Sequence, residues 1–506
     1  MSAVLVPLAM ITALCAFVAI GVPAAWGLAG VASIFAMIGI GISVIDDTFL
    51  LAIPARLTGS IISSQYLLAI PPFVLMGVIM TQSQLATRMA TGVRIIFGSK
   101  NTLKSLLILG IFLAASTGIA AASVVMLAML AWPIMQAANI HAKRLGLGLI
   151  CAAGSLAQFI PPSLLLILLA EHINAAHLFA QNAQGNWAPD PVTIGHLFAG
   201  ALVPGIILAG LYGLYLTLAK HSSTWHTFAD EQKHATLTMV SAWFWGMIVP
   251  ALLILSILGA ILAGIATTTQ AATLGVCFTI ILAALAKDDS NLVRLAAPIL
   301  LGCLVLFILS GFWGWNITQA SGILVAIGVI GITPYLGKSL WQAIAHEAIV
   351  LVGMIFAIII CASVFVLVMK AFGGDTAIRR ILQDLPGGAY GGVFVVVSVV
   401  FLLGCILDGI EIVTILVPVC APVLLASGDI SPIWLGVCLA LALQSSYLTP
   451  PFGLAIIFAR SVIPKSIAIS EFYRAVWPFV GLQILLFLLL LGVPQIATGL
   501  PNLLYQ

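Results

Sequence analysis

The sequence has few charged residues for its length. Of its 506 residues only 7% are Asp, Glu, Lys or Arg, whereas 62% are hydrophobic, and the mean hydropathy is +1.24. Soluble domains carry about 25% charged residues, which excludes this chain from that class. Apolar runs long enough to cross about 30 Å of hydrocarbon recur along the chain, which predicts an all-α, multi-pass membrane protein.

Other absences narrow the function further. The eight cysteines stand singly in apolar runs, without a CxxC pair, which indicates reduced packing residues. The net charge of +3 is too small and too scattered to indicate nucleic-acid binding. A P-loop is not indicated either, because Gly331 and Gly337-Lys338-Ser339 have the wrong spacing, so we expect no ATP drive.

The sequence contains no pattern typical of an intramembrane enzyme. His346-Glu347 lacks the second histidine of an HExxH metal site. His172 and His177 fall in a stretch that we interpret as a polar loop, where solvated histidines are expected. We therefore predict that the protein is not an enzyme.

Apolar spans alternate with short polar breaks along the chain. The predicted spans lie near residues 5–26, 28–52, 67–81, 103–137, 147–170, 196–219, 239–263, 271–286, 295–313, 319–336, 346–371, 392–426, 433–459 and 475–498. The longest polar stretches, Glu171–Thr193 and Lys220–Thr238, are too short to fold alone. Binding chemistry is therefore expected inside the membrane or in a partner protein.

Two spans, 103–137 and 392–426, are too long and too often interrupted for one crossing, so each is predicted to be a re-entrant hairpin. Each is followed by a helix with a double proline in its middle, Pro161-Pro162 or Pro450-Pro451. A Pro-Pro pair removes two donors and forces the preceding residue toward an extended backbone, so the helix must break there. The two units therefore form an internal repeat of hairpin and discontinuous helix.

Basic residues indicate how the two copies are oriented. Lys100, Lys104, Lys143 and Arg144 flank the first hairpin, whereas the segment 171–219 after its broken helix contains no Lys or Arg. By the positive-inside rule the first hairpin opens to the cytoplasm. In the second copy the basic residues Arg460 and Lys465 follow the broken helix instead, although Arg379 and Arg380 before the hairpin indicate the opposite orientation. We predict inverted repeats.

Polar residues gather at both predicted breaks, where secondary transporters bind ions and solutes with hydroxyls and unwound carbonyls. The first repeat contributes Ser116, Thr117, Gly118, Ser123, Gly154, Ser155, Gln158 and Ser163. The second contributes Asp408, Glu411, Thr414, Gln444, Ser445, Ser446, Thr449 and Gly453. We expect Na⁺, a hard cation that prefers oxygen, at the two breaks, with ligands from Ser116, Ser155, Ser445 and Thr449.

Each of these residues also has a structural interpretation. Asp408 and Glu411 stand one turn apart in an apolar run, where ionisable groups are costly and usually functional. The alternative is that they lie near water and fix a helix terminus. For the Ser and Thr residues the alternative is hydrogen bonding between helices.

Several motifs together are typical of one family. They are Leu-Leu-Ala-Ile-Pro-Pro-Phe (67–73), Ala-Ala-Ser-Thr-Gly-Ile (114–119), Cys-Ala-Ala-Gly-Ser-Leu-Ala-Gln-Phe-Ile-Pro-Pro-Ser (151–163), Leu-Asp-Gly-Ile-Glu (407–411) and Gln-Ser-Ser-Tyr-Leu-Thr-Pro-Pro-Phe-Gly (444–453). The sequence thereby resembles the DctM-like large permease subunit of TRAP (tripartite ATP-independent periplasmic) transporters. The resemblance is closest to the mannitol/chloroaromatic branch, which is similar to carriers of 2-oxo acids and related carboxylates.

The resemblance implies an elevator mechanism driven by Na⁺, in which hairpins and broken helices move as a block against a scaffold. It also implies a small four-helix membrane subunit, a periplasmic substrate-binding protein and a place in the bacterial inner membrane. The expected divisions are N-terminal scaffold helices (1–98), a first transport repeat (99–195), further scaffold helices (196–371), a second transport repeat (372–470) and a C-terminal helix (471–506).

The sequence departs from the family pattern in three places. Thr267-Thr268-Thr269-Gln270-Ala271-Ala272 stands where the family has Thr-Pro-Thr-Glu-Ala-Ala, and Ser123 stands where many members carry an acidic residue. The region 287–340, which includes Trp313-Gly314-Trp315, is longer than expected. The alternatives are a stand-alone Na⁺/carboxylate symporter and a channel, although paired interrupted helices favour alternating access over a continuous pore.

Overall fold

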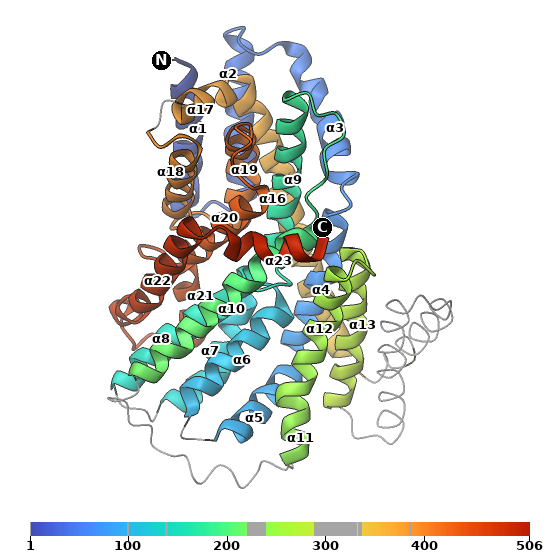
Figure 1. The fold of residues 1–506 in the computed structure, drawn as a ribbon, viewed down its shortest axis with the longest axis vertical. Coiled ribbons are helices and arrows are strands. Elements are labelled where there is room, and N and C mark those ends of the chain that lie inside the picture. Colours follow the sequence, from blue (N-terminus) through green and yellow to red (C-terminus); the bar gives the residue numbers. More distant parts are fainter. Residues whose placement is uncertain are drawn as a thin grey trace.

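The computed structural model describes residues 2–98, 101–136, 140–219, 239–287, 331, 336–383 and 386–505. Helices dominate this part of the chain (Figure 1). Within it, seven helices are long and apolar enough to cross a membrane, or eight if one bent pair counts as a span. The prediction of an all-α, multi-pass membrane protein is confirmed.

The N-terminal helices differ in part from the predicted spans. Helix α1 covers Ser2–Ala19, and α2 begins after Pro23 and covers Ala24–Gly41, so the span expected at 28–52 is misplaced. Short helices follow, including α3 (Ala52–Leu57). Helices α4 (Ile70–Gln82) and α5 (Leu85–Phe97) are bent by 64° at Ser83-Gln84, and α5 was not predicted as a span.

The first repeat has the predicted hairpin and broken helix. Helices α6 (Thr102–Thr117) and α7 (Ala120–Met135) are joined by a tight turn at Gly118-Ile119. Helix α8 (Ile140–Ser155) ends in the 3-10 turn Leu156–Gln158, and α9 (Leu164–Ala183) begins after the break. The interruption lies at Pro161-Pro162, as predicted.

The second repeat has the same order of elements. Helices α18 (Gly388–Leu403) and α19 (Gly409–Leu425) form the hairpin, and α20 (Pro432–Leu448) is separated from α21 (Leu454–Val462) by the Pro450-Pro451 break. Both Pro-Pro peptide bonds are cis. The two hairpins lie at opposite ends of the molecule, with α6 and α7 in its lower half and α18 and α19 in its upper half (Figure 1).

The remaining helices surround these two units. They are α10 (Ile194–Ala219), α11 (Met239–Trp243), α12 (Val249–Leu262), α13 (Thr268–Lys287), α16 (Lys338–Ala371), α17 (Gly374–Gln383), α22 (Ile469–Gly492) and α23 (Gln495–Tyr505). Helices α2, α4, α13 and α16 pack against one another, whereas α10 and α22 pack on the broken helices. The predicted span 295–313, the Trp313-Gly314-Trp315 motif and nearly all of the span 319–336 lie outside the described residues.

One polar stretch is helical rather than a loop. Helix α9 continues through Glu171, His172 and His177 to Ala183, so the interpretation of 171–193 as a polar loop is wrong over its first half. Glu171 and His172 line a cavity between helices, so the helix can carry them without exposing them to lipid. His172 belongs to the protein interior instead of a solvated loop, since it lines a cavity described below.

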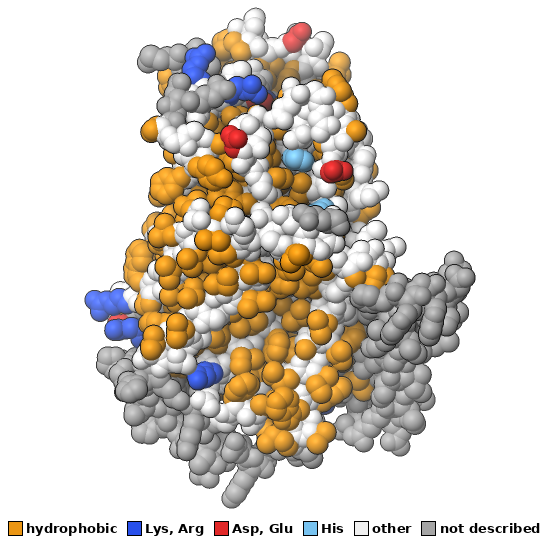
Figure 2. Space-filling view, in the orientation of Figure 1, with side chains coloured by type: hydrophobic (Ala, Val, Ile, Leu, Met, Phe, Trp, Pro, Cys, Tyr) orange, Lys and Arg blue, Asp and Glu red, His pale blue; other side chains and the backbone are white. Residues whose placement is uncertain are grey.

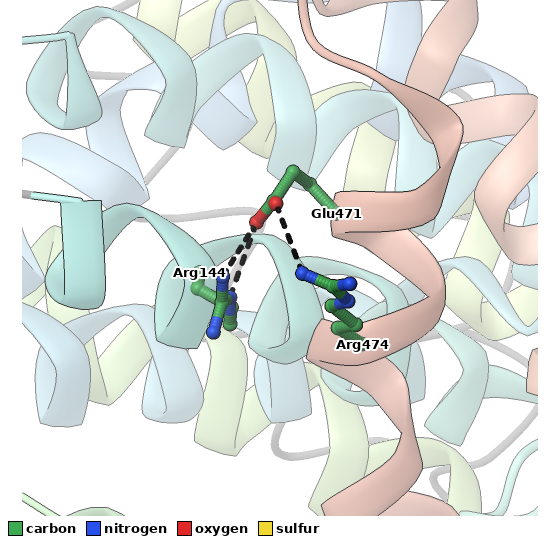
Figure 3. A network of polar contacts seen from close by, with 3 residues as sticks. All are labelled: Arg144, Glu471 and Arg474. Atoms are coloured by element: carbon green, nitrogen blue, oxygen red, sulfur yellow. Dashed lines mark hydrogen bonds and ion pairs between the residues drawn. The ribbon is translucent and has the colours of Figure 1, made fainter.

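An ion-pair network attaches α22 to the start of α8 (Figure 3). Arg144 donates to Glu471 Oε2 from Nε at 3.1 Å and from Nη2 at 3.0 Å, and Arg474 lies 4.0 Å from the other carboxylate oxygen. Both partners of the Arg144–Glu471 pair are about one third exposed, so its energetic contribution is small, about 0–1 kcal/mol. Its main effect is to orient α22 on the broken helix.

The outer surface is suited to lipid. On the face shown, hydrophobic side chains cover most of the middle, whereas Lys, Arg, Asp and Glu are few and lie in its upper part and toward its lower left (Figure 2). Large apolar side chains such as Trp26, Met37, Leu255 and Ile349 are exposed. In water this surface would be unfavourable, but within a bilayer it is matched by its solvent.

Gly118 provides a test of how the first hairpin is held. Its φ is +64°, and a Cβ there would lie 3.0 Å from the carbonyl oxygen of Pro162, whereas Gly264 has φ +68° with no described atom within 4 Å of a built Cβ. Gly264→Ala should cost about 1–2 kcal/mol of left-handed strain. Gly118→Ala should cost that strain plus about 1–3 kcal/mol of overpacking.

The measurement is the thermal unfolding midpoint of both variants in detergent. Gly118→Ala should lower the midpoint clearly more than Gly264→Ala does. Equal midpoints would show that the hairpin turn does not rest on the Pro161-Pro162 break.

Candidate functional site

The tip of the first hairpin sits on the break of the first discontinuous helix. The Leu164 N–H, at the start of α9, donates to the Gly118 carbonyl at 3.2 Å. A glycine is required at 118 because of its positive φ and the close approach of the Pro162 carbonyl. Thr117 and Ser123 face each other across the same turn, with 2.5 Å between their hydroxyl oxygens.

The second hairpin contacts both breaks. A Cβ on Gly404, at the end of α18, would overlap the Ser446 side chain, so only glycine allows this tip to reach the second break. A Cβ on Gly409, at the start of α19, would lie 3.8 Å from the Gln158 amide nitrogen and 3.1 Å from Leu165. The second tip therefore touches the first break as well.

In each repeat, the second half of the broken helix packs on the hairpin of the other repeat. Helix α9 of the first repeat packs on α19 of the second, and α21 of the second packs on α7 and α8 of the first. Cys151 in α8 approaches the Ala455 carbonyl of α21 at 3.8 Å, and α20 packs on the 3-10 turn Leu156–Gln158. The structure thus places the segments around the two double prolines in one region.

Hydroxyls at the breaks bond back to their own helices. Ser155 donates to the Ala152 carbonyl at 2.9 Å, Ser445 to Leu441 at 2.8 Å and Thr449 to Ser445 at 2.8 Å. Ser446 donates to Leu443 and Ser163 to Gln158, each at 2.8 Å. Each hydroxyl uses its hydrogen in this way and keeps oxygen lone pairs that can face a cation.

Several buried polar atoms at the breaks accept or donate no hydrogen bond within the described residues. They are Ser116 Oγ, Gln158 Oε1, Glu411 Oε2 and both amide atoms of Gln444. Ser116 and Gln444 are fully buried, and Gln158 and Glu411 are 7% exposed. Leaving such atoms unpaired costs about 1–3 kcal/mol each, so their gathering at one place indicates a site where a ligand or ion supplies the partner.

Asp408 and Glu411 differ in their surroundings. Asp408 is the N-cap of α19, where φ is −72° and ψ is 156°, and Glu411 lies in the first turn. A helix N-terminus favours carboxylates, so a structural role explains both positions. It does not explain Glu411 Oε2, which is buried and has no hydrogen-bond partner among the described residues.

The set of donors suits a hard monovalent cation better than a transition metal. Hydroxyls of Ser116, Ser155, Ser445 and Thr449 offer neutral oxygens, and Glu411 offers a carboxyl oxygen. Hard cations select oxygen ligands of this kind. Thr414 donates to the carbonyls of Ile410 and Glu411, and Gly154 and Gly453 lie beside the breaks without offering side-chain ligands.

A charged cavity of about 260 Å³ was not found from the sequence. Helices α3, α9, α16, α17 and α19 line it, and its charged side chains are Arg56, Glu171, Lys370, Asp375 and Arg379. Thr414 lines its wall, which connects it to the second hairpin. The available signal was Glu171-His172 inside an apolar pattern, which we assigned to a loop.

The departure at 267–272 has a local explanation. The Thr267 N–H donates to Gln270 Oε1 at 2.9 Å, and the Gln270 N–H donates to Thr267 Oγ1 at 3.3 Å. This reciprocal pair is a capping box at the start of α13. Gln270 therefore fulfils a capping role without the glutamate of the family pattern.

The motifs and the geometry agree with the comparison with known families. A family model described as "Tripartite ATP-independent periplasmic transporter, DctM component" matches residues 11–496. The chain belongs to this family. It is therefore a component of a membrane transporter, related to large permease subunits rather than to enzymes.

Individual relatives are distant in sequence. The C4-dicarboxylate TRAP transporter large permease protein DctM of Vibrio cholerae is 26% identical over 373 residues, which cover 72% of this chain and 70% of that protein. The isethionate TRAP transporter permease protein DctMQ of Oleidesulfovibrio alaskensis is 24% identical over 485 residues, or 95% of this chain and 64% of that protein.

Solved structures share the fold. The YdaH transporter of Alcanivorax borkumensis has a TM-score of 0.54 at 18% identity, covering 90% of this chain and 91% of that one. MtrF of Neisseria gonorrhoeae has a TM-score of 0.51 at 13% identity, covering 88% and 83%. At this identity the likeness shows a shared transporter fold and nothing finer.

Gln444 tests whether the unpartnered polar atoms have a functional purpose. Gln444→Leu removes an unsatisfied buried amide, so it should raise the thermal unfolding midpoint of the ligand-free protein, by a gain of about 1–3 kcal/mol. It should also abolish transport. The midpoint in detergent and uptake into proteoliposomes measure the two effects.

Gln483→Leu is the matched control. Gln483 is also fully buried, and its Oε1 has no partner among the described residues, but its Nε2 donates to the Tyr212 hydroxyl at 2.8 Å. Its replacement should lower the midpoint, because Tyr212 loses this partner. A lowered midpoint in Gln444→Leu would mean that the Gln444 amide already has its partner within the protein.

Proposed function

We propose that this chain is the large permease subunit of a Na⁺-driven, binding-protein-dependent importer of a small organic acid. The observation that carries the proposal is the group of buried, unpartnered polar atoms where the two inverted repeats meet. Such a group is costly for the empty protein, and a cation and solute that bind there would supply the missing partners.

Na⁺ is the proposed coupling ion, bound at the two breaks. Ser116 and Ser155 serve the first site, and Ser445 and Thr449 serve the second. One charge that moves through 100 mV yields about 2.3 kcal/mol. Hundredfold solute accumulation costs about 2.8 kcal/mol, so two ions suffice without ATP.

An elevator movement is the proposed mechanism. The repeats at 99–195 and 372–470 pack reciprocally through α9–α19 and α7–α21, which supports their movement as one block. Helices α2, α4, α13 and α16 pack mainly on one another and serve as the scaffold. Helices α10 and α22 pack on the broken helices, so we assign them to the moving block, although the division by sequence placed them in 196–371 and 471–506.

The proposed solute is a small carboxylate. Relatives are named for C4-dicarboxylates, isethionate and ectoine, all small polar solutes of organic-acid type. The assignment to the mannitol/chloroaromatic branch, with 2-oxo acids as solutes, stays a prediction. The proposed partners are a small four-helix membrane subunit and a periplasmic substrate-binding protein, with all three acting at the bacterial inner membrane.

Thr449→Ala tests the proposed Na⁺ site. Loss of one oxygen ligand should raise the Na⁺ concentration for half-maximal uptake about tenfold, which corresponds to about 1.4 kcal/mol. Thr449→Ser, which keeps the hydroxyl, should restore the wild-type value. Uptake is measured in proteoliposomes that contain this chain and its two partners, under an imposed Na⁺ gradient.

Thr279→Ala is the control for that experiment. Thr279 is fully buried and bonds back to the Val276 carbonyl at 2.9 Å in α13, away from the breaks. Its replacement should leave the Na⁺ dependence unchanged. Normal Na⁺ dependence in Thr449→Ala would remove this hydroxyl from the ion site, and uptake without the binding protein would favour a stand-alone symporter.

A further inference from the structure

The cavity of about 260 Å³ lies between the proposed scaffold and the proposed moving block. Arg56 of α3 and Lys370 of α16 line it from the scaffold side. Asp375 and Arg379 of α17 line it from the side of the moving block, because α17 belongs to the repeat 372–470. Glu171 and His172 of α9 and Thr414 of α19 line it from the moving block as well. Three basic and two acidic side chains thus line one cavity.

Two carboxylate oxygens in this cavity are buried and accept no hydrogen bond within the described residues. One is Glu171 Oε2 and the other is Asp375 Oδ1. Asp375 Oδ2 is paired, since it lies 3.4 Å from Lys370 Nζ. Buried carboxylate oxygens almost always accept a hydrogen bond. We therefore expect a ligand of this cavity to carry a hydrogen-bond donor.

We propose that the cavity binds a small carboxylate that also carries a hydrogen-bond donor, such as a 2-hydroxy acid. The basic side chains attract the ligand's carboxylate, and Glu171 Oε2 or Asp375 Oδ1 accepts the one hydrogen bond that its hydroxyl donates. Sites for drug-sized ligands measure about 300–1,000 Å³, so this cavity is suited to an acid of a few carbon atoms. The proposal rests on the proposed function as a carboxylate importer.

This site is separate from the helix breaks but adjoins them. Thr414 lines the cavity, and its hydroxyl bonds to the carbonyls of Ile410 at 2.8 Å and Glu411 at 3.0 Å. A solute held in the cavity therefore lies about one turn of α19 from the Glu411 carboxylate. The walls of the cavity belong to the proposed scaffold and to the proposed moving block. In this proposal the site therefore holds the solute before the block moves against the scaffold.

Modification of a single cysteine tests the site directly. Ser363 of α16 lines the cavity, so Ser363→Cys is made in a chain whose native cysteines are replaced, and its reaction with anionic and cationic methanethiosulfonates is timed in nanodiscs. The anionic reagent should react faster. Lactate should slow the reaction at about one tenth of the concentration that propionate needs, because propionate lacks the hydroxyl.

Arg379→Gln and Arg380→Gln form a matched pair for this experiment. Both residues are exposed neighbours on α17, but only Arg379 is among the residues that line the cavity. Arg379→Gln should reduce both the preference for the anionic reagent and the protection by lactate, whereas Arg380→Gln should change neither. The change of formal charge is the same in both.

Equal protection by lactate and propionate would overturn the proposal, and so would no protection by either acid or equal effects of the two arginine variants. The readout needs no Na⁺ gradient and no binding protein. Failure of Na⁺-driven uptake would therefore count against the proposed function alone, and failure of protection would count against this site alone.

Discussion

A helix can be interrupted inside a membrane only where protein or a bound ligand satisfies the exposed backbone and polar groups, because lipid cannot. The whole arrangement follows from this constraint. Each double proline breaks a helix, and the break is covered by a hairpin tip instead of by lipid. The Gly118 carbonyl receives the Leu164 N–H, and Gly404 brings the second tip against Ser446. Exchange of α9 and α21 between the repeats then brings the two breaks together, and Pro451 and Phe452 of the second break stay exposed.

The covering is incomplete at several buried side-chain atoms. Ser116, Glu411 and Gln444 keep buried polar atoms that have no partner in the part of the chain that the structure describes. A protein selected only for stability would place apolar residues there. Unpaired buried polar atoms that cost stability are typical of a site where a bound ligand supplies the missing partners. Such a site suits a transporter, which must release its ion as readily as it binds it.

Much of this fold could be predicted from local signals, and the rest depends on contacts between distant segments. The Pro-Pro pairs predicted both breaks, and polar interruptions predicted both hairpins, because each effect acts within a few residues. The extension of α9 through Glu171 and His172 was missed, since hydropathy cannot tell a loop from a helix face that lines a cavity. That cavity joins five helices between residues 56 and 423, so no local pattern reveals it.

The central claim is that Na⁺ completes the site where the two breaks meet, and its most direct test is the thermal stability of the purified chain in Na⁺ and in K⁺ at equal ionic strength. A ligand that binds only the folded state stabilises it by RT ln(1 + [L]/Kd). The account predicts an unfolding midpoint that rises with Na⁺ concentration and does not rise with K⁺. Equal midpoints in the two salts at every concentration would contradict it.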